Sequence, residues 1–211
     1  MLNVDRVLVL APHTDDAEFG CGATLSKLVE QEIEVYSVAF SICETSVPDG
    51  FPRDILDTEV RKATHVLGIE PDHLVVHRYP VRRFFEHRQE ILEELVRLRR
   101  EIEPDLILLP SSDDIHQDHQ VISQEGLRAF KHASMLGYEM TWNNLTFIAS
   151  AFVHLEKRHV DQKLVALRQY ESQQHRIYAD EGFIKSLARV RGAQASVEYA
   201  EAFQVIRWVI R

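Results

Sequence analysis

The 211-residue sequence has few cysteines and no long apolar stretch. Its two cysteines, Cys21 and Cys43, form neither a CxxC pair nor the dense pattern of a disulfide-stabilised domain, which suits a reducing compartment. No run of 18 apolar residues occurs, and the short apolar run near the N-terminus is interrupted by charge and lacks a cleavage site. We therefore expect a cytoplasmic protein with neither a membrane span nor an export signal.

Positive charge and glycine are also scarce. The chain has 24 Lys and Arg against 33 Asp and Glu, a formal net charge of −9. No broad positive field is available to attract nucleic acid or anionic lipid, so these partners are not expected. Only eight glycines occur, and Gly20 and Gly22 do not complete a GxGxxG fingerprint. The dinucleotide-binding interpretation therefore fails, and a nucleotide-binding module, as an alternative function, would need a glycine-rich phosphate loop that the sequence lacks.

Apolar runs and amphipathic segments alternate along the chain instead. Up to residue 110 the pattern predicts strands at 6–10, 34–41, 73–77 and 105–110, separated by helices at 22–31, 54–67 and 86–102. Strands that are apolar on both faces and separated by helices indicate an α/β fold whose mostly parallel sheet is covered on both sides.

After residue 120 the elements are less regular. We expect a helix to about residue 131, a strand near 147–153, helices near 156–170 and 180–191, and a terminal strand at 203–210. No internal repeat or low-complexity tract interrupts the pattern, and the length suits one compact domain. The sequence therefore predicts a single domain over residues 1–211.

Histidine and aspartate gather in two loops that follow predicted strands. The first loop lies within "APHTDDAEFG" (11–20) and the second is "PSSDDIHQDH" (110–119). Ligands of parallel α/β sheets bind outside the carboxyl ends of the strands, so two such loops can converge on one point. Together they offer His13, Asp15, Asp16, Glu18, Asp113, Asp114, His116, Asp118 and His119.

Imidazole nitrogen and carboxylate oxygen are the ligands that zinc or another divalent first-row metal takes. Three protein ligands leave a position for water, which ionises near neutral pH when it binds such a metal. A further carboxylate can accept the proton, and a further donor can stabilise an oxyanion. The two loops contain enough residues for all of these roles.

Five segments of the sequence, taken in order, resemble the LmbE-like or PIG-L-type zinc N-deacetylases. "PHTDDAEFGCGATL" is similar to that family's HPDDE…GCGG signature, and "HQDH" is similar to its HPDH signature. Three more segments resemble family motifs over nearly the whole chain: "EVRKATHVLG", "KLVALRQYESQ" and "RGAQASVEYAEAF". Thr14, Gln117 and Ala23 depart from the signatures, but none of them is a proposed ligand.

The resemblance implies a Rossmann-like three-layer sandwich with a metal site at the C-terminal ends of the strands. It implies that His13, Asp16 and His119 bind zinc, that Asp15 is the general base and that His116 stabilises the oxyanion. The implied substrate is a small N-acetylated amino sugar or its conjugate. The oligomeric state is open, and a homo-oligomer is possible.

Other residues are candidates for substrate binding. Arg82 and Arg83 follow the strand at 73–77 and could bind a phosphate or hydroxyl group. The loop at 43–54 with Arg53, and the segment 138–144 with Trp142, contain bulky and polar side chains that could frame a pocket.

Two alternative functions would use the same histidines and aspartates. A metal-dependent hydrolase could act on a different amide or on a phosphoester, and only a panel of substrates separates it from a sugar deacetylase. A non-catalytic metal- or carbohydrate-binding relative would be expected to lack the base, whereas Asp15 is present.

Overall fold

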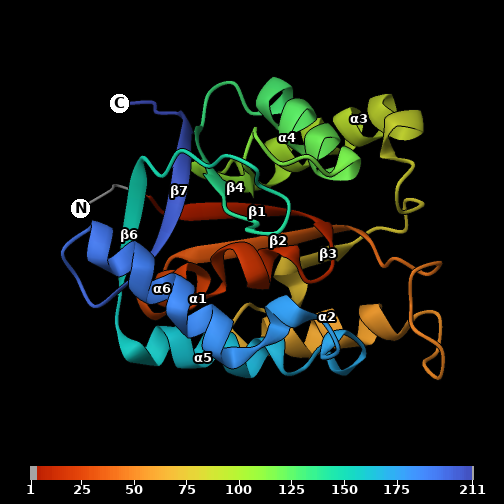
Figure 1. Cartoon of the computed structure of the whole chain (residues 1–211). Helices are drawn as coiled ribbons and strands as arrows, with labels where there is room; N and C mark the ends of the chain where they lie inside the picture. Colours follow the sequence, from red (N-terminus) through yellow and green to blue (C-terminus); the bar gives the residue numbers. More distant parts are fainter. Residues whose placement is uncertain (1–3, 211) are drawn as a thin grey trace.

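A seven-stranded sheet forms the centre of the computed structural model, which describes residues 4–210 (Figure 1). The strand order is β3-β2-β1-β4-β5-β7-β6. Strands β1 to β5 are parallel, and β7 is antiparallel to both of its neighbours. The strands are β1 (Arg6–His13), β2 (Glu34–Ser41), β3 (Leu74–Val76), β4 (Leu106–Pro110), β5 (Ser134–Tyr138), β6 (Ala151–Leu155) and β7 (Tyr199–Arg207).

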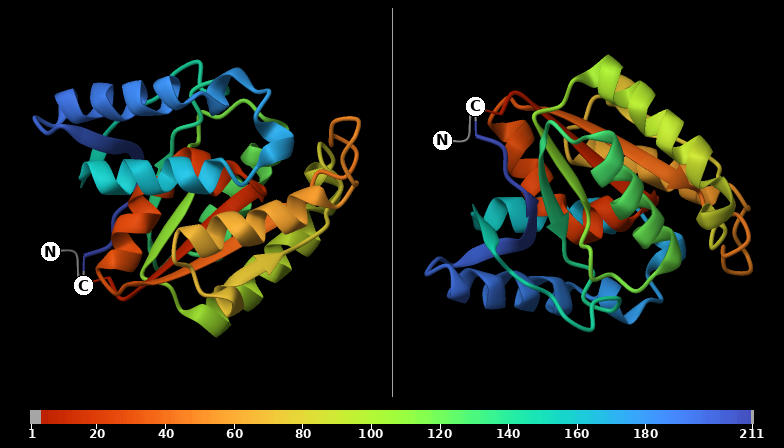
Figure 2. Two further views of the ribbon diagram at one scale, coloured as in Figure 1. Left: turned by 90° about the horizontal axis from the view of Figure 1, so that it is seen from below. Right: turned by 90° about the horizontal axis from the view of Figure 1, so that it is seen from above.

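Helices cover both faces of this sheet (Figure 2). One layer contains α1 (Asp16–Glu30), α2 (Ile55–Val66), α5 (Lys157–Leu167) and α6 (Glu181–Gln194). The other layer contains α3 (Arg88–Ile102) and α4 (Gln117–Ala129). Short 3-10 helices occur at Pro71–His73, Phe84–His87, Glu171–Gln173 and Ile177–Ala179.

The central strand β1 shows why the chain forms three layers. Its alternate side chains point to opposite faces, because successive residues of a strand do so. Val7 and Val9 belong to the core beneath α1, α2 and α5, whereas Leu8 and Leu10 belong to the core beneath α3 and α4. All four side chains are fully buried. The predicted three-layer α/β fold with a mostly parallel sheet is therefore confirmed.

Strand β5 and the start of α1 differ from the sequence-based expectation. No strand was expected at Ser134–Tyr138, because "SMLGY" is short, lacks β-branched residues and contains a glycine. Pairing with β4 and β7 on either side nevertheless makes it a strand.

Helix α1 begins at Asp16 instead of residue 22, and its backbone leaves helical geometry at Cys21. The expected helix therefore corresponds to the part of α1 that follows this break.

The last strand is shifted along the sequence relative to the prediction. Strand β7 covers Tyr199–Arg207, whereas the sequence predicted 203–210.

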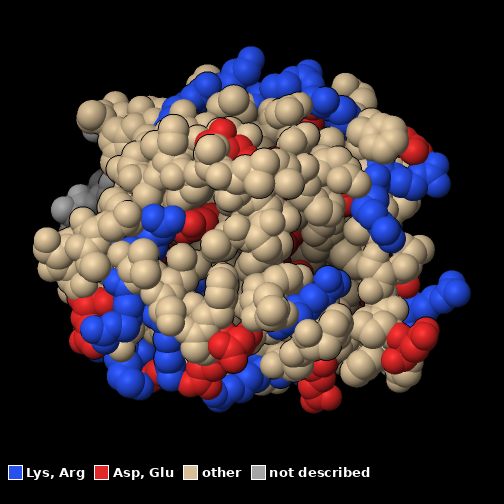
Figure 3. All heavy atoms as spheres, viewed as in Figure 1, with Lys and Arg blue, Asp and Glu red and all other residues tan. Residues whose placement is uncertain are grey.

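The charged side chains are unevenly distributed on the face shown in Figure 3. Acidic and basic side chains are mixed along its lower part, and basic side chains line its upper edge. Among residues 4–210, no helix has the length and apolar character needed to cross a bilayer.

Candidate metal centre and active site

The sheet brings the two charged loops together at one edge. Strand β1 ends at His13, and its neighbour β4 ends at Pro110, just before the loop that leads into α4. His13 and His119 are 106 positions apart, yet His13 Nδ1 lies 3.3 Å from His119 Nε2. The parallel pairing of β1 with β4 is therefore what joins the two motifs.

Three donor atoms form a nearly equilateral triangle. Asp16 Oδ2 lies 3.2 Å from His13 Nδ1 and 3.2 Å from His119 Nε2, and the two imidazole nitrogens are 3.3 Å apart. Tetrahedral zinc with ligands at about 2.0–2.1 Å requires donor atoms about 3.3–3.4 Å apart. The chemistry and spacing of this set therefore fit a divalent metal ion such as zinc.

His116 lies beside this triangle. A ring nitrogen of His116 is within 4.8 Å of nitrogens of His13 and His119, so the three histidines also form a candidate metal cluster. His116 is the N-cap residue of α4, and its Nδ1 accepts a hydrogen bond from the Asp118 N–H at 3.2 Å. In the neutral imidazole the proton is then on Nε2, which can donate to another group.

Two buried carboxylates orient the histidines of the triangle. Asp118 Oδ2 lies 3.0 Å from His13 Nε2, and Asp114 Oδ2 lies 2.7 Å from His119 Nδ1. An ionised carboxylate only accepts hydrogen bonds, so these imidazole nitrogens donate. When these imidazoles are neutral, as metal binding requires, the lone pairs of His13 Nδ1 and His119 Nε2 are directed at the centre of the triangle. Carboxylate–histidine pairs of this kind are typical partners of metal-binding histidines.

The electrostatics of the site favour positive charge at its centre. Burial opposes charging of the imidazoles, but Asp16 and the hydrogen-bonded carboxylates raise the pKa of His13 to about 9 and that of His119 to about 10. The same two histidines hold the pKa of Asp16 far below its usual range despite its burial. The same carboxylates would stabilise a divalent cation at the centre of the triangle.

Asp15 and His116 have pKa values shifted in opposite directions. Burial, with the neighbouring Asp16 carboxylate, raises the pKa of Asp15 to about 6. Burial, with the positive charges of His13 and His119, lowers the pKa of His116 to about 4. At neutral pH Asp15 is thus mostly an ionised base, and His116 is a neutral imidazole.

A cavity of about 300 Å³ opens over these side chains. The loops after all five parallel strands contribute to its wall, as does the connection between α5 and α6. The residues are His13, Asp15, Asp16, Cys43, Ser46, Leu56, Val81, Arg82, His116, His119, Trp142, Asn143, Gln173, Arg176 and Tyr178.

Four residues were expected to contact substrate, and the structure divides them into two pairs. Arg82 and Trp142 line the cavity. Arg53 and Arg83 are not among the lining residues, and the exposed Arg83 forms an ion pair with Glu86 at 2.6 Å. The Arg83 guanidinium is thus paired on the protein surface, whereas Arg82 is part of the cavity wall.

The sequence reasoning did not single out Arg176 or Tyr178. Tyr178 stacks on Trp142, with ring centroids 3.7 Å apart and an angle of 11° between the rings. Both aromatic rings line the cavity. The sequence feature that could have indicated these two residues is the segment "KLVALRQYESQ", which resembles a family motif. Arg176 and Tyr178 follow its final residue, Gln173, by a few positions.

Two hydrogen-bonded contacts hold this connection in place. Buried Glu59 of α2 accepts hydrogen bonds from Ser172 N at 2.9 Å and from Ser172 Oγ at 2.6 Å. The Tyr170 hydroxyl donates to the carbonyl oxygen of Thr14 at 2.7 Å. The segment that follows α5 is therefore linked directly to the backbone between His13 and Asp15.

Fold and site together define an α/β protein with a candidate histidine–carboxylate metal site at the carboxyl edge of a mostly parallel sheet. The model of the PIG-L family, described as GlcNAc-PI de-N-acetylase, matches residues 8–130. The match covers more than half of the chain, and the chain belongs to this family.

Known proteins are similar to this chain in sequence or in fold. The chain is 27% identical to the uncharacterized deacetylase YaiS of Escherichia coli K12, over 79% of this chain and 90% of the relative. The N,N'-diacetylchitobiose deacetylase of Pyrococcus horikoshii superposes with a TM-score of 0.81 at 20% identity, covering 97% of this chain and 84% of the other. GalB, the 4-carboxy-2-hydroxymuconate hydratase of Pseudomonas putida KT2440, superposes with a TM-score of 0.79 at 18% identity, covering 98% of each chain.

Proposed function

We propose that this protein is a zinc-dependent N-deacetylase that removes the acetyl group from an N-acetylated amino sugar or its conjugate. The observation that carries the proposal is the triangle of His13 Nδ1, Asp16 Oδ2 and His119 Nε2, with Asp15 and His116 beside it. Membership of a de-N-acetylase family supports the reaction class. The fold alone does not support this reaction class, because a hydratase has the same fold.

His13, Asp16 and His119 are the residues that would hold the metal. Zinc bound there would polarise the amide carbonyl and lower the pKa of a water molecule. Asp114 and Asp118 keep the two imidazoles in the tautomers that this role requires.

Asp15 is suited to move the proton during hydrolysis. It lines the cavity next to the triangle, and a pKa of about 6 allows it to exchange protons near neutral pH. We propose that Asp15 takes a proton from the attacking water as the new C–O bond forms. It then delivers the proton to the amide nitrogen as the C–N bond breaks, and acetate and the free amine leave.

His116 is suited to stabilise the carbonyl oxygen as negative charge develops on it. Its Nδ1 accepts the Asp118 N–H, so its Nε2–H is available as a donor. Its lowered pKa keeps it neutral and leaves the tautomer fixed by that hydrogen bond. A hydrogen-bond donor fixed in advance stabilises a developing oxyanion without reorganisation.

The cavity wall supports a sugar as the substrate. The Trp142–Tyr178 stack offers an aromatic surface for the apolar face of a pyranose ring, while Arg82 and Arg176 offer donors for hydroxyl or phosphate oxygens. The Arg82 N–H donates to Asp118 Oδ2 at 2.6 Å, which ties this part of the wall to His13.

The test is acetate release by the zinc-reconstituted protein from N-acetylglucosamine derivatives that are free, nucleotide-linked or aglycone-linked. We expect release that needs both zinc and Asp15, so that Asp15→Asn loses it. Asp113→Asn is the matched control, because Asp113 contacts Gln204 and does not line the cavity.

If zinc binds and none of these compounds is cleaved, the sugar-deacetylase proposal is wrong. The same protein would then be tested on other amides and on phosphoesters, which the same side chains could hydrolyse. If Asp113→Asn loses acetate release as completely as Asp15→Asn, the role of Asp15 as the base is not supported.

A further inference from the structure

Helix α1 is broken next to the candidate metal centre. At Cys21 its backbone has φ −148° and ψ 19°, outside helical geometry, so a short segment, Asp16–Gly20, precedes the main part of the helix. In a regular α-helix the N–H of Ala23 would donate to the carbonyl oxygen of Phe19. A break of this kind leaves such backbone groups in need of other partners.

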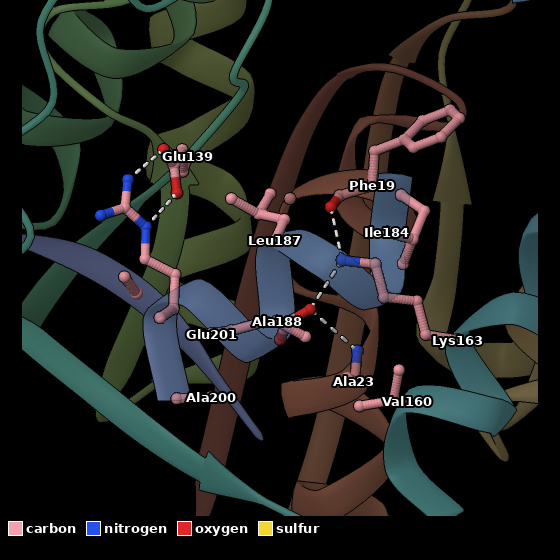
Figure 4. Close-up of a pocket in the computed structure, with 13 residues that line it drawn as sticks. Phe19, Ala23, Glu139, Val160, Lys163, Ile184, Leu187, Ala188, Ala200 and Glu201 are labelled. Atoms are coloured by element: carbon pink, nitrogen blue, oxygen red, sulfur yellow. Dashed lines mark hydrogen bonds and ion pairs between the residues drawn. The ribbon is translucent and has the colours of Figure 1, made fainter. Parts of the chain in front are cut away.

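A buried ion pair contacts both sides of the break (Figure 4). Lys163 Nζ donates to the Phe19 carbonyl oxygen at 2.6 Å and to Glu201 Oε1 at 2.7 Å. The Glu201 carboxylate accepts the N–H of Ala23 at 3.2 Å and the N–H of Thr24 at 2.7 Å. The two charged side chains thus bind the backbone groups that the break exposes.

The pair is almost completely removed from solvent. The side chains of Lys163, on α5, and Glu201, on β7, are 6% and 8% exposed. Desolvating two charges costs free energy, and a buried ion pair is often no more stabilising than apolar residues of the same volume. A contribution to overall stability is therefore a weak explanation for burying these two charges, whereas their contacts with α1 are a specific explanation.

The segment Asp16–Gly20 carries two parts of the active site. Asp16 contributes one corner of the donor triangle. The ring of Phe19 packs edge-on against Trp142 and Tyr178, with centroid distances of 5.4 and 5.3 Å. A shift of this segment would therefore displace both a donor atom and the aromatic wall of the cavity.

We propose that Lys163 and Glu201 are positioning residues for the metal centre. The pair keeps the segment Asp16–Gly20 at a fixed place against α5 and β7, so that Asp16 Oδ2 remains within reach of His13 and His119. This inference rests on the proposed metal site. It also gives a role to Lys163 and Glu201 themselves, which lie in the segments "KLVALRQYESQ" and "SVEYAEAF" and do not line the cavity of the candidate site.

The experiment compares Lys163→Met with Arg191→Met. Arg191 forms an ion pair with Glu139 that is also largely buried, with side chains 16% and 8% exposed, beside the same small cavity of about 20 Å³. The hydrogen bonds of Arg191 are to Glu139 and Gln194, neither of which belongs to α1. This variant therefore removes a comparable ion pair without freeing the break in α1.

The readouts are the zinc dissociation constant, from competition with a chromophoric chelator, and the visible spectrum of the cobalt(II) form. We expect Lys163→Met to weaken zinc binding about 2- to 30-fold, the range of couplings that act through intermediate residues, and to alter the cobalt spectrum. Arg191→Met should bind zinc and cobalt as the wild-type protein does. Lys163→Met and Arg191→Met should both have a lower melting temperature than the wild type. If Lys163→Met does not fold, Glu201→Gln is the second variant, since it keeps the side-chain size but removes the charge.

Wild-type zinc affinity and an unchanged cobalt spectrum in the folded Lys163 or Glu201 variant would overturn the positioning role. An equal loss of affinity in Arg191→Met would also overturn it, because the effect would then be one of general stability. A wild-type protein that binds no zinc would instead contradict the proposed function, and the positioning role with it.

Discussion

His13 Nε2 lies 3.0 Å from Asp118 Oδ2, although 105 positions separate the two residues. The Asp118 side chain is fully buried, and it also accepts the backbone N–H groups of Arg82, at 2.6 Å, and Phe84, at 3.3 Å. One carboxylate thus orients a proposed metal ligand and holds the loop that places Arg82 in the cavity wall.

The first prediction concerns this carboxylate. Asp118→Asn should weaken zinc binding about 10- to 100-fold, because an amide can donate to His13 Nε2 and so favour the wrong imidazole tautomer. Chelator competition measures the change. Asp113→Asn, in the loop before α4, is the control, and equal zinc affinity in the two variants would contradict the assigned role of Asp118.

The second prediction concerns the donor triangle. His119→Ala should reduce the bound zinc from one ion per chain to none after dialysis, because it removes one of three donor atoms whose lone pairs converge. Elemental analysis of the purified protein measures this. His65→Ala, on the exposed surface of α2, should retain the metal. Retention of a full complement of zinc by His119→Ala would remove His119 from the ligand set.

The third prediction separates two roles for His116. If it stabilises the oxyanion, His116→Ala should lower kcat for acetate release about 10²- to 10³-fold while zinc content is unchanged. The histidine cluster would also permit His116 to bind the metal directly. Loss of zinc from His116→Ala, measured on the same preparation as kcat, would show that it is a ligand.

The fourth prediction concerns the aromatic wall. Trp142→Ala should raise KM for the sugar substrate about 2- to 12-fold with a smaller change in kcat, because a stacking surface binds ground state and transition state alike. Steady-state kinetics measure both constants. Trp208→Ala is the control, since Trp208 is 45% exposed and does not line the cavity. An unchanged KM in Trp142→Ala would argue against stacking.

The fifth prediction concerns stability. Tyr170→Phe should lower the free energy of unfolding by about 1–3 kcal/mol, because it leaves the buried Thr14 carbonyl without the Tyr170 hydroxyl as its donor. Urea denaturation measures the loss. Tyr36→Phe, at a partly buried tyrosine that stacks on His73, should have a much smaller effect. Equal stability of the two variants would show that the Thr14 contact contributes little.

Much of the fold followed from local patterns. Apolar runs such as "RVLVL" and "DLILLP" indicated buried parallel strands, and the positive φ of 81° at Gly68 agrees with the predicted end of α2. The family resemblance is confirmed by the match over residues 8–130. The convergence of His13 with His119 was expected because both follow parallel strands, whose carboxyl ends share one edge of the sheet.

The sequence by itself thus determined the layer order, the edge that carries the site and the residue types that meet there, because periodicity and strand polarity are local properties. Only the tertiary structure decided that "SMLGY" is a strand, that Asp118 pairs with His13, and that Arg82 lines the cavity while Arg53 does not. The same holds for the contact of Lys163 and Glu201 with the break in α1. These features depend on which distant segments pack together, and neither propensity nor spacing along the chain contains that information.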